Sequence, residues 1–116
     1  MEQREILSEK KSAVLFKLIG EYHNSKNIKK GINETIKAIK DGSALCVVLA
    51  NDSVPMCLTD SITLLCEQQG TSYVYVQSKD SLGKACKLPL DTISVAIVEK
   101  KNEDNTRLNK DFSEFL

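Results

Sequence analysis

Ala44–Ala50 reads Ala-Leu-Cys-Val-Val-Leu-Ala, an unbroken apolar run that decides the fold class of this chain. A strand with one face in water alternates apolar and polar residues, whereas a strand that is covered on both faces is apolar throughout. The run therefore predicts a central strand in a sheet that has a layer of helices on each face.

The segments on either side of this strand are expected to alternate between helices and strands. Before it, apolar spacing predicts a helix from about Arg4 to Tyr22, and Asn27 is a candidate cap for a second helix that Asp41-Gly42 ends. After it we expect, in order, a helix from Pro55 to Gln69, a strand over Tyr73–Val76, a helix from Ser78 or Ser81 to about Cys86, a strand over Ile93–Glu99 and a C-terminal helix with Leu108, Phe112, Phe115 and Leu116. This alternation predicts an α/β fold, a three-layer α/β/α sandwich around a small mixed sheet, formed by residues 1–116 as a single domain.

Composition places the chain among ordinary globular proteins. Its 116 residues are 41% hydrophobic and 28% charged. The longest apolar runs, Ala44–Ala50 and Ile93–Val98, are far shorter than the ~20 residues that span a bilayer. The first residues, Met1-Glu2-Gln3-Arg4-Glu5, are charged and have no apolar core behind them, so we expect neither a secretion signal nor a membrane partner.

The net charge limits which nucleic acids the chain could bind. Sixteen basic and sixteen acidic residues cancel, and affinity for nucleic acid of any sequence comes mainly from neutralised phosphates. Neutrality therefore argues against a sequence-blind phosphate binder. It is compatible with a protein that recognises one folded RNA through a local basic patch, for which the candidates are Lys26, Lys29, Lys30 and Lys37.

The reactive residue types indicate neither a metal site, nor a cofactor, nor an enzyme. None of the four cysteines forms a C-x-x-C pair and each has apolar neighbours, so we expect buried free thiols in a reducing compartment. His23 is the sole histidine, so the chain has no second histidine for a His-based acid–base or metal pair. Ser81-Leu82-Gly83-Lys84 matches the Ser-x-x-Lys motif of one hydrolase class, but the partner motifs of that class are missing.

The segment that says most about function is Lys29–Lys37, with the sequence Lys-Lys-Gly-Ile-Asn-Glu-Thr-Ile-Lys. Read as a helix at about 100° per residue, it separates a stripe of isoleucines from a polar patch. The stripe comprises Ile28, Ile32, Ile36 and Ile39, and the patch comprises Lys30, Asn33, Glu34 and Lys37. An amide, a carboxylate and ammonium groups in one patch have the hydrogen-bonding capacity to read base edges. Gly31 would leave room for a nucleic-acid backbone at the helix N-terminus, whose free N–H groups favour phosphate. The ordinary alternative is an amphipathic helix with a solvated polar face.

Several motifs, in order along the chain, resemble the kink-turn RNA-binding ribosomal protein superfamily, in words the L-seven-Ae group. They are Gly31-x-Asn33-Glu34-x-x-Lys37 after basic residues, the strand and turn of Leu45–Pro55, the helix end Leu64-Leu65-Cys66-Glu67, and Tyr73–Lys79 followed by Leu82-Gly83-Lys84-Ala85-Cys86. The resemblance covers about residues 28–98 and implies the same three-layer fold. The group includes an archaeal large-subunit ribosomal protein that also serves in box C/D RNPs, and eukaryotic relatives in the tri-snRNP and in snoRNPs.

This resemblance implies a target and a first set of contacts. The target is kink-turn RNA, a stem bent sharply at a short bulge beside tandem sheared G·A pairs. Asn33 and Lys37 would meet guanine acceptor edges, and Glu34 would accept from a guanine or order its neighbours. Phosphate would be contacted by Lys30 and Gly31, with Lys29 in the same basic run.

The resemblance also implies a second contact region, the loop Lys87-Leu88-Pro89-Leu90-Asp91, which in the family receives the flipped-out bulge nucleotide. Leu88 and Leu90, on either side of Pro89, would pack on the splayed base and sugar. The alternative is that these leucines cap the core. Lys79 would reach a phosphate, or else is an ordinary exposed lysine.

Two positions depart from the family pattern. Spliceosomal members carry a basic residue where this chain has Leu90, and the acidic residue that precedes the proline in the family is Val54 here. Val54, at the expected bulge contact, would remove one polar contact. The loop resembles the archaeal version more closely than the spliceosomal one.

The implied function is that of a non-catalytic protein that recognises and stabilises kink-turn RNA and nucleates RNP assembly. Its partners would be a snoRNA, snRNA or rRNA and other RNP core proteins, and it would be a monomer outside the particle. We expect it in the nucleus or nucleolus if it is eukaryotic, and in the cytoplasm if it is ribosomal or archaeal. The alternative is a protein-interaction subunit of an RNP that has the same fold and has lost direct RNA recognition.

Overall fold

The predicted central run lies inside a mixed sheet. The computed structural model describes residues 6–52, 57–100 and 103–116. Within them, the strands β1 (Ile28–Lys30), β2 (Ala44–Ala50), β3 (Ser72–Val76) and β4 (Ser94–Val98) follow the order β1-β4-β2-β3 across the sheet. Strand β2 pairs parallel with β3 and antiparallel with β4, and β4 pairs antiparallel with β1.

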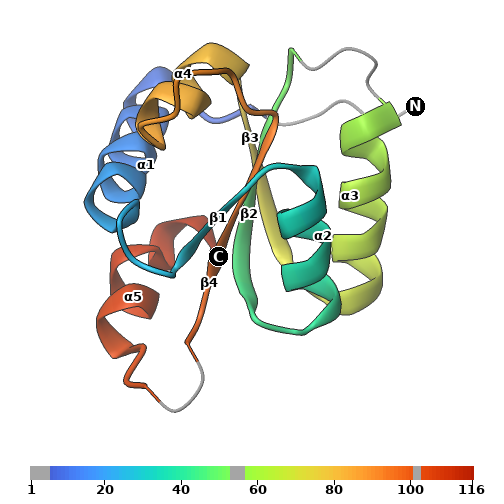
Figure 1. Ribbon diagram of the computed structural model, residues 1–116, viewed down its shortest axis with the longest axis vertical. Helices are drawn as coiled ribbons and strands as arrows, with labels where there is room; N and C mark the ends of the chain where they lie inside the picture. Colours follow the sequence, from blue (N-terminus) through green and yellow to red (C-terminus); the bar gives the residue numbers. More distant parts are fainter. Residues whose placement is uncertain (1–5, 53–56, 101–102) are drawn as a thin grey trace.

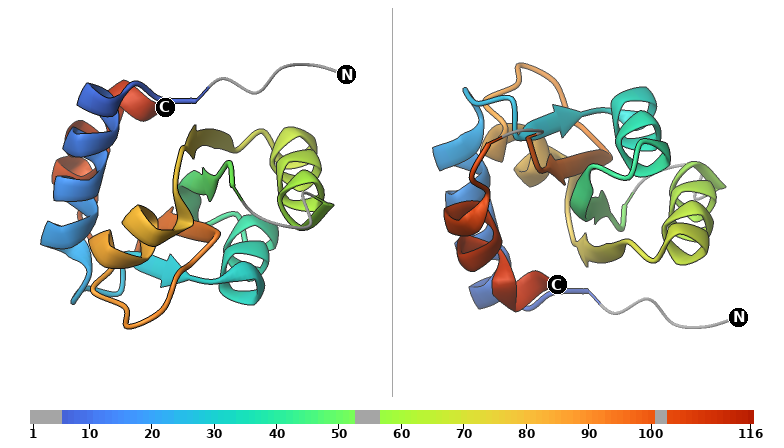
Figure 2. Two further views of the ribbon diagram at one scale, coloured as in Figure 1. Left: turned by 90° about the horizontal axis from the view of Figure 1, so that it is seen from above. Right: turned by 90° about the horizontal axis from the view of Figure 1, so that it is seen from below.

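Helices cover both faces of this sheet, as the views along and across the molecule show (Figures 1 and 2). One face carries α1 (Glu9–Tyr22), α4 (Lys79–Ala85) and α5 (Thr106–Asp111), and the other carries α2 (Ile32–Lys40) and α3 (Cys57–Gln69). A 3-10 turn, η1 (Ser113–Phe115), follows α5. The three-layer α/β/α sandwich predicted from the sequence is therefore confirmed.

Strand β2 explains why its sequence is apolar throughout. Cys46, Val48 and Ala50 point into the core beneath α1 and α4, whereas Val47 and Leu49 point into the core beneath α2 and α3. All five side chains are fully buried. Because successive residues of a strand face opposite sides of the sheet, a strand between two helical layers needs an apolar residue at every position.

The prediction that a helix runs through Lys29 and Lys30 is wrong. Both lysines belong to β1, whose residues pair with β4, Lys29 opposite Ala96 and Lys30 opposite Val95. Helix α2 begins only after Gly31. The ladder partners of β1 lie more than sixty residues further along the chain, so local periodicity carries no signal for this short strand.

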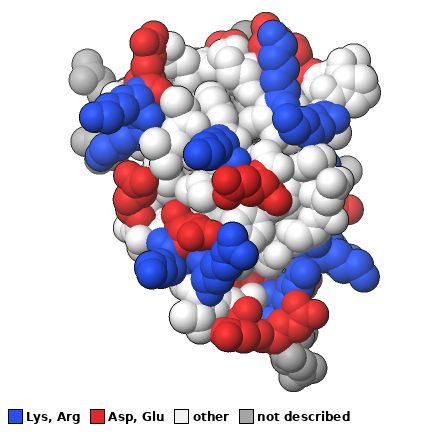
Figure 3. Space-filling view, turned by 90° about the vertical axis from the view of Figure 1, so that its left-hand side faces the viewer, with Lys and Arg blue, Asp and Glu red and all other residues white. Residues whose placement is uncertain are grey.

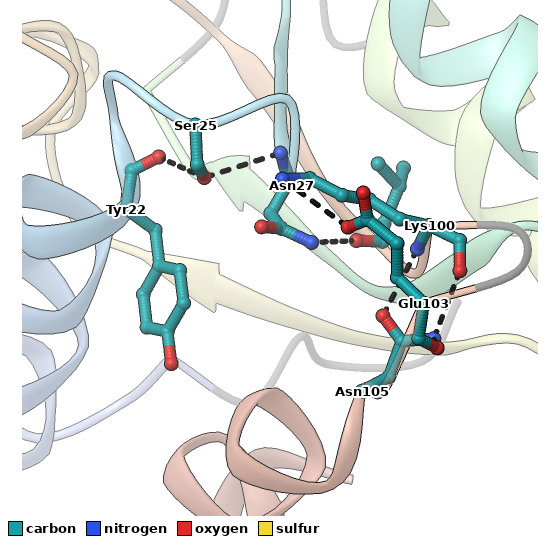
Figure 4. A network of polar contacts seen from close by, with 7 residues as sticks. Tyr22, Ser25, Asn27, Lys100, Glu103 and Asn105 are labelled. Atoms are coloured by element: carbon teal, nitrogen blue, oxygen red, sulfur yellow. Dashed lines mark hydrogen bonds and ion pairs between the residues drawn. The ribbon is translucent and has the colours of Figure 1, made fainter.

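Asn27 does not cap a helix, contrary to the prediction. Its side-chain amide is buried and donates to the carbonyl oxygen of Val98 at 2.8 Å (Figure 4). Its backbone N–H donates to Ser25 Oγ at 3.2 Å, and that hydroxyl donates to the Tyr22 carbonyl at 2.6 Å. Further along, Asn105 bridges the backbone of Lys100 in both directions. These bonds fix the turn between α1 and β1 and the connection that follows β4.

The first and last helices also differ from their predicted extents. Helix α1 begins at Glu9 behind Ser8, whose hydroxyl accepts from the Lys11 N–H at 3.2 Å. Ile6 instead forms a parallel bridge with Tyr75, beside β3. The C-terminal helix divides into α5 and η1 at Phe112. The predicted helix start at Pro55 and the site residue Val54 lie outside the described residues.

Within the part of the chain that the structure describes, no helix combines the length and the apolar character needed to cross a membrane.

Candidate nucleic-acid interface

The N-terminus of α2 is an open surface. Gly31 precedes the helix with φ at 92°, in the left-handed region that favours glycine. A Cβ at this position would meet no atom within 4 Å, so the space above it is free. The helix has no side-chain cap at this end. The N–H groups of its first turn therefore remain available, and such groups favour an anion such as phosphate.

The polar face of α2 is exposed, as its predicted role requires. Asn33, Glu34 and Lys37 are all exposed to solvent. The side of α2 that faces the sheet consists of Thr35, Ala38 and Ile39, which are buried, and of Ile32 and Ile36, which are partly buried. The core stripe thus differs from the predicted one, because Ile28 lies in β1 and packs in the core on the opposite face of the sheet.

The two lysines of β1 lie on opposite faces of the sheet, so they do not form one patch with each other. Neighbouring residues of a strand point to opposite faces of the sheet, so Lys30 shares the side of buried Ile28 and Lys29 takes the side of α2. Burial raises the pKa of the Cys86 thiol to about 11, and the nearby ammonium group of Lys30 opposes this shift. Lys30 is therefore close to the end of α4, where the predicted second contact region begins.

The two leucines of the loop of residues 87–91 differ in burial, so one caps the core and the other is free to contact a ligand. Leu88 is partly buried and packs against the core beneath α1 and α4. Leu90 is 78% exposed, and Pro89 beside it is also exposed. Leu88 therefore caps the core, whereas Leu90 is an apolar side chain in solvent without such a role.

Helix α4 holds this loop close against itself. The Leu88 N–H donates to the Gly83 carbonyl at 3.0 Å, and the Thr92 N–H donates to the Lys79 carbonyl at 3.4 Å. A Cβ at Gly83 would lie 2.6 Å from the carbonyl oxygen of Leu90. The loop can adopt this path because residue 83 has no side chain.

The start of α2 and the end of the loop meet at one residue, Ser94. Its carbonyl oxygen accepts from the Gly31 N–H at 2.9 Å and from the Thr92 hydroxyl at 3.1 Å. Its own hydroxyl lies 3.2 Å from that of Thr35. The two predicted contact regions, separate in sequence, are therefore adjacent in the structure.

Lys79 lies among carboxylates. Its backbone N–H donates to Asp52 Oδ1 at 2.8 Å. The pKa of Asp91 is raised, first by a hydrogen bond with Asp80, then by desolvation and the charge of Asp80, and the charge of Lys79 opposes this shift. The predicted phosphate contact of Lys79 would therefore be made beside partly compensating negative charge.

On the side of the molecule that carries α1 and α5, basic and acidic side chains are interspersed (Figure 3).

Among the described residues, no group of three or more His, Cys, Asp or Glu side chains could hold a metal ion.

Sequence reasoning missed four residues that shape this region. Thr35 and Ser94 are fully buried, Thr92 is nearly so, and Gly83 is in close contact with the loop backbone. Thr35 lies inside the Gly31–Lys37 motif, but on the side of the helix that faces the core. Gly83 belongs to the Leu82–Cys86 motif. The sequence alone assigns no role to either residue. Ser94 becomes recognisable only through pairing with Gly31 and Thr35, about sixty positions away, and Thr92 only through its bond to Ser94.

Comparison with known proteins agrees with this architecture. The model of the ribosomal protein L7Ae/L30e/S12e/Gadd45 family matches residues 13–107. Among solved structures, a similar one is the Giardia lamblia 15.5kD RNA binding protein, with a TM-score of 0.84 and 30% sequence identity. The match covers 95% of this chain and 88% of the Giardia chain.

Proposed function

Because this chain belongs to the ribosomal protein L7Ae/L30e/S12e/Gadd45 family, we propose that it is a non-catalytic RNA-binding protein that recognises a kink-turn. The similarity to a solved RNA binding protein across nearly the whole chain supports this assignment. The observation that carries it is the junction at Ser94, which brings the N-terminus of α2 next to the end of the loop that bears Leu90.

The chemistry of this surface suits a folded RNA better than a plain duplex. Asn33 can donate and accept, Glu34 accepts, and Lys37 donates, so together they can contact base edges of sheared G·A pairs. The open N–H groups after Gly31 would bind a phosphate, and Lys30 adds a positive charge. The exposed side chain of Leu90 offers an apolar platform for a base that has left the stack.

Binding of this kind would act by selecting one RNA conformation. A kink-turn that interconverts between bent and extended forms is shifted towards the bent form by a protein with higher affinity for that form. A stabilised bend presents its two stems at a fixed angle, and this is how the protein would nucleate assembly of a ribonucleoprotein with further core proteins.

A fluorescence titration tests the proposal. The wild-type protein is titrated against a labelled kink-turn and against a duplex of the same length, at two salt concentrations. We expect a marked preference for the kink-turn. We also expect a salt slope of magnitude no greater than about 4, since the proposed interface uses Lys29, Lys30, Lys37 and Lys79 to neutralise phosphates.

The variant with Asn33→Ala and Glu34→Ala should lose binding by about a hundredfold, since each base contact contributes about 1–3 kcal/mol of discrimination. Both side chains are exposed, so the melting temperature should stay close to that of the wild type. Lys40→Ala, an exposed position at the far end of the same helix, is the matched control and should bind normally. Equal affinity of the wild type for kink-turn and duplex would contradict the proposal, and binding to neither RNA would favour a protein-interaction subunit of the same fold.

A further inference from the structure

A chain of hydrogen bonds runs beneath the proposed interface and touches each segment that would face the RNA. It starts at the α2 N-terminus, where the Thr35 hydroxyl donates to the Gly31 carbonyl at 2.7 Å. It continues from Thr35 to Ser94 and from Ser94 to the Thr92 hydroxyl. From Thr92 it passes through the backbone of Lys79, which in turn donates to Asp52 in the segment that follows β2.

The three hydroxyl-bearing residues of this chain are shielded from solvent. Thr35 and Ser94 are 0% exposed and Thr92 is 7% exposed. Since a hydroxyl has a single hydrogen, the Thr35 hydroxyl donates to one oxygen at a time. When it donates to the Gly31 carbonyl, the Ser94 hydroxyl can donate to Thr35. Buried polar groups need such partners, so the hydroxyls of Thr35 and Ser94 restrict each other, and the hydroxyl of Thr92 is held by the Ser94 carbonyl.

The bonds at Ser94 join the two contact regions directly. Its carbonyl oxygen accepts simultaneously from the backbone N–H of Gly31 and from the side chain of Thr92. A shift of the loop that displaces Thr92 would therefore act on the acceptor that fixes the start of α2. The backbone bond from Gly31 links the start of α2 to Ser94, and the Thr92 side chain extends this link to the residues that precede β4.

We propose that Thr35, Ser94 and Thr92 are positioning residues that set the distance between the α2 N-terminus and the loop that bears Leu90. The inference rests on the proposed function, because the gain lies in the recognition of an RNA that must contact both regions at once. A rigid RNA bend can be matched only if the two protein regions keep a fixed separation, and preorganisation of this kind raises affinity without a direct contact.

The first test separates the hydroxyl of Thr35 from its shape. Thr35→Val keeps the volume and loses the hydroxyl, whereas Thr35→Ser keeps the hydroxyl and loses a methyl group. We expect Thr35→Val to weaken kink-turn binding by about tenfold or more and Thr35→Ser to lie within about threefold of the wild type, a loss of one hydrogen bond being worth roughly a factor of ten. If packing alone mattered, Thr35→Ser would be the weaker binder, and that order would overturn the proposal.

The second test uses a matched pair of serines. Ser94→Ala removes the hydroxyl that bonds to Thr35 and keeps the carbonyl oxygen that accepts from Gly31 and Thr92. Ser12→Ala removes the hydroxyl of another buried serine, which bonds to the Leu7 carbonyl on the α1 side. At comparable melting temperatures, Ser94→Ala should lower the affinity for the kink-turn and Ser12→Ala should not. Equal affinities in the two variants would contradict a positioning role.

The third test needs no RNA. In an ¹⁵N–¹H correlation spectrum, Thr92→Val should move the amide peak of Gly31, because both groups donate to one carbonyl oxygen. The peaks of Gly42 and Gly70 should stay in place. A fixed Gly31 peak would overturn the inference even if the wild type binds the kink-turn. If Thr92→Val shifts the Gly31 peak but the wild type does not bind the kink-turn, the proposed function is contradicted and the link between the two regions is still supported.

Discussion

A methyl group at Gly83 would lie 2.6 Å from the carbonyl oxygen of Leu90 and 3.1 Å from the Cα of Asp91. Both are backbone atoms, so neither can turn away as a flexible side chain would. The loop that bears Leu90 must therefore move before any larger residue can occupy position 83. Gly20, in α1, is the natural comparison, because its added methyl group would only approach the Ala85 carbonyl at 3.7 Å.

Gly83→Ala should displace the loop and weaken kink-turn binding by about tenfold, because a misplaced platform loses its contact with the splayed base. Gly20→Ala should bind normally and unfold at a slightly higher temperature, since alanine is the better helix former by about 1 kcal/mol. The measurement is a titration of both variants together with their thermal melts. Unchanged binding by Gly83→Ala would show that the path of the loop is unimportant for recognition.

Individual residues also show which features of the interface can be predicted from the sequence and which cannot. Asn33, Glu34 and Lys37 were expected on an exposed helical face, and that face is exposed. Their RNA contacts stay a prediction. Thr35 stands between them in sequence, yet its buried hydroxyl acquires meaning only from Ser94, fifty-nine positions away. A pattern of local spacing contains no information on such a pairing.

At the scale of elements, the difference between β1 and β2 explains which strands the sequence reveals. Strand β2 is buried on both faces, so its composition alone identifies it. Strand β1 is three residues long and carries two lysines, and its identity comes from hydrogen bonds to β4. The sequence predicts Gly31 in the first turn of the helix, whereas in the structure this glycine, with φ at 92°, lies between β1 and α2.

The loop between α4 and β4 provides the prediction at this scale. Leu90→Asp places a carboxylate near RNA phosphate and removes the exposed apolar side chain, so affinity for the kink-turn should fall by at least about tenfold. Because Leu90 is 78% exposed, the stability of the protein should not change. Leu88→Asp is expected to lower the melting temperature instead, since Leu88 packs against the core.

Both variants are compared by kink-turn titration and by urea denaturation. If Leu90→Asp binds the kink-turn as tightly as the wild type, the loop is not part of the interface. Leu88→Asp with unaltered stability would contradict the assignment of that side chain to the core.

For the molecule as a whole, the two cores make the stability depend on pH in the alkaline range. Burial is the main cause that raises the pKa of the thiol to about 12 for Cys46 and about 11 for Cys66 and Cys86, against a usual value of 9.0. Cys46 and Cys86 belong to the core beneath α1 and α4, and Cys66 to the core beneath α2 and α3. Each thiol must remain protonated while the protein is folded.

The sign of the effect follows from linkage between protonation and folding. The unfolded chain loses thiol protons above pH 9 and the folded chain retains them up to about pH 11. The contribution of these thiols to the free energy of unfolding should therefore be constant below pH 9 and fall as the pH rises towards 11. Urea denaturation from pH 7.5 to 11 measures the free energy of unfolding. Alkylation of the native protein, with mass spectrometry to quantify the labelling of each cysteine, measures how accessible the thiols are. Rapid labelling of Cys46, Cys66 and Cys86 in the native protein at pH 8 would contradict the burial of these thiols.

The central claim is that the α2 N-terminus and the loop before β4 form one RNA-binding surface. The most direct measurement is a titration of ¹⁵N-labelled protein with an unlabelled kink-turn, in which every backbone amide reports its own environment. We predict that the amides that shift cluster at residues 29–37 and 87–94, with α1 and α5 unaffected. Shifts concentrated on α1 and α5, or the same shifts with a plain duplex, would contradict the claim.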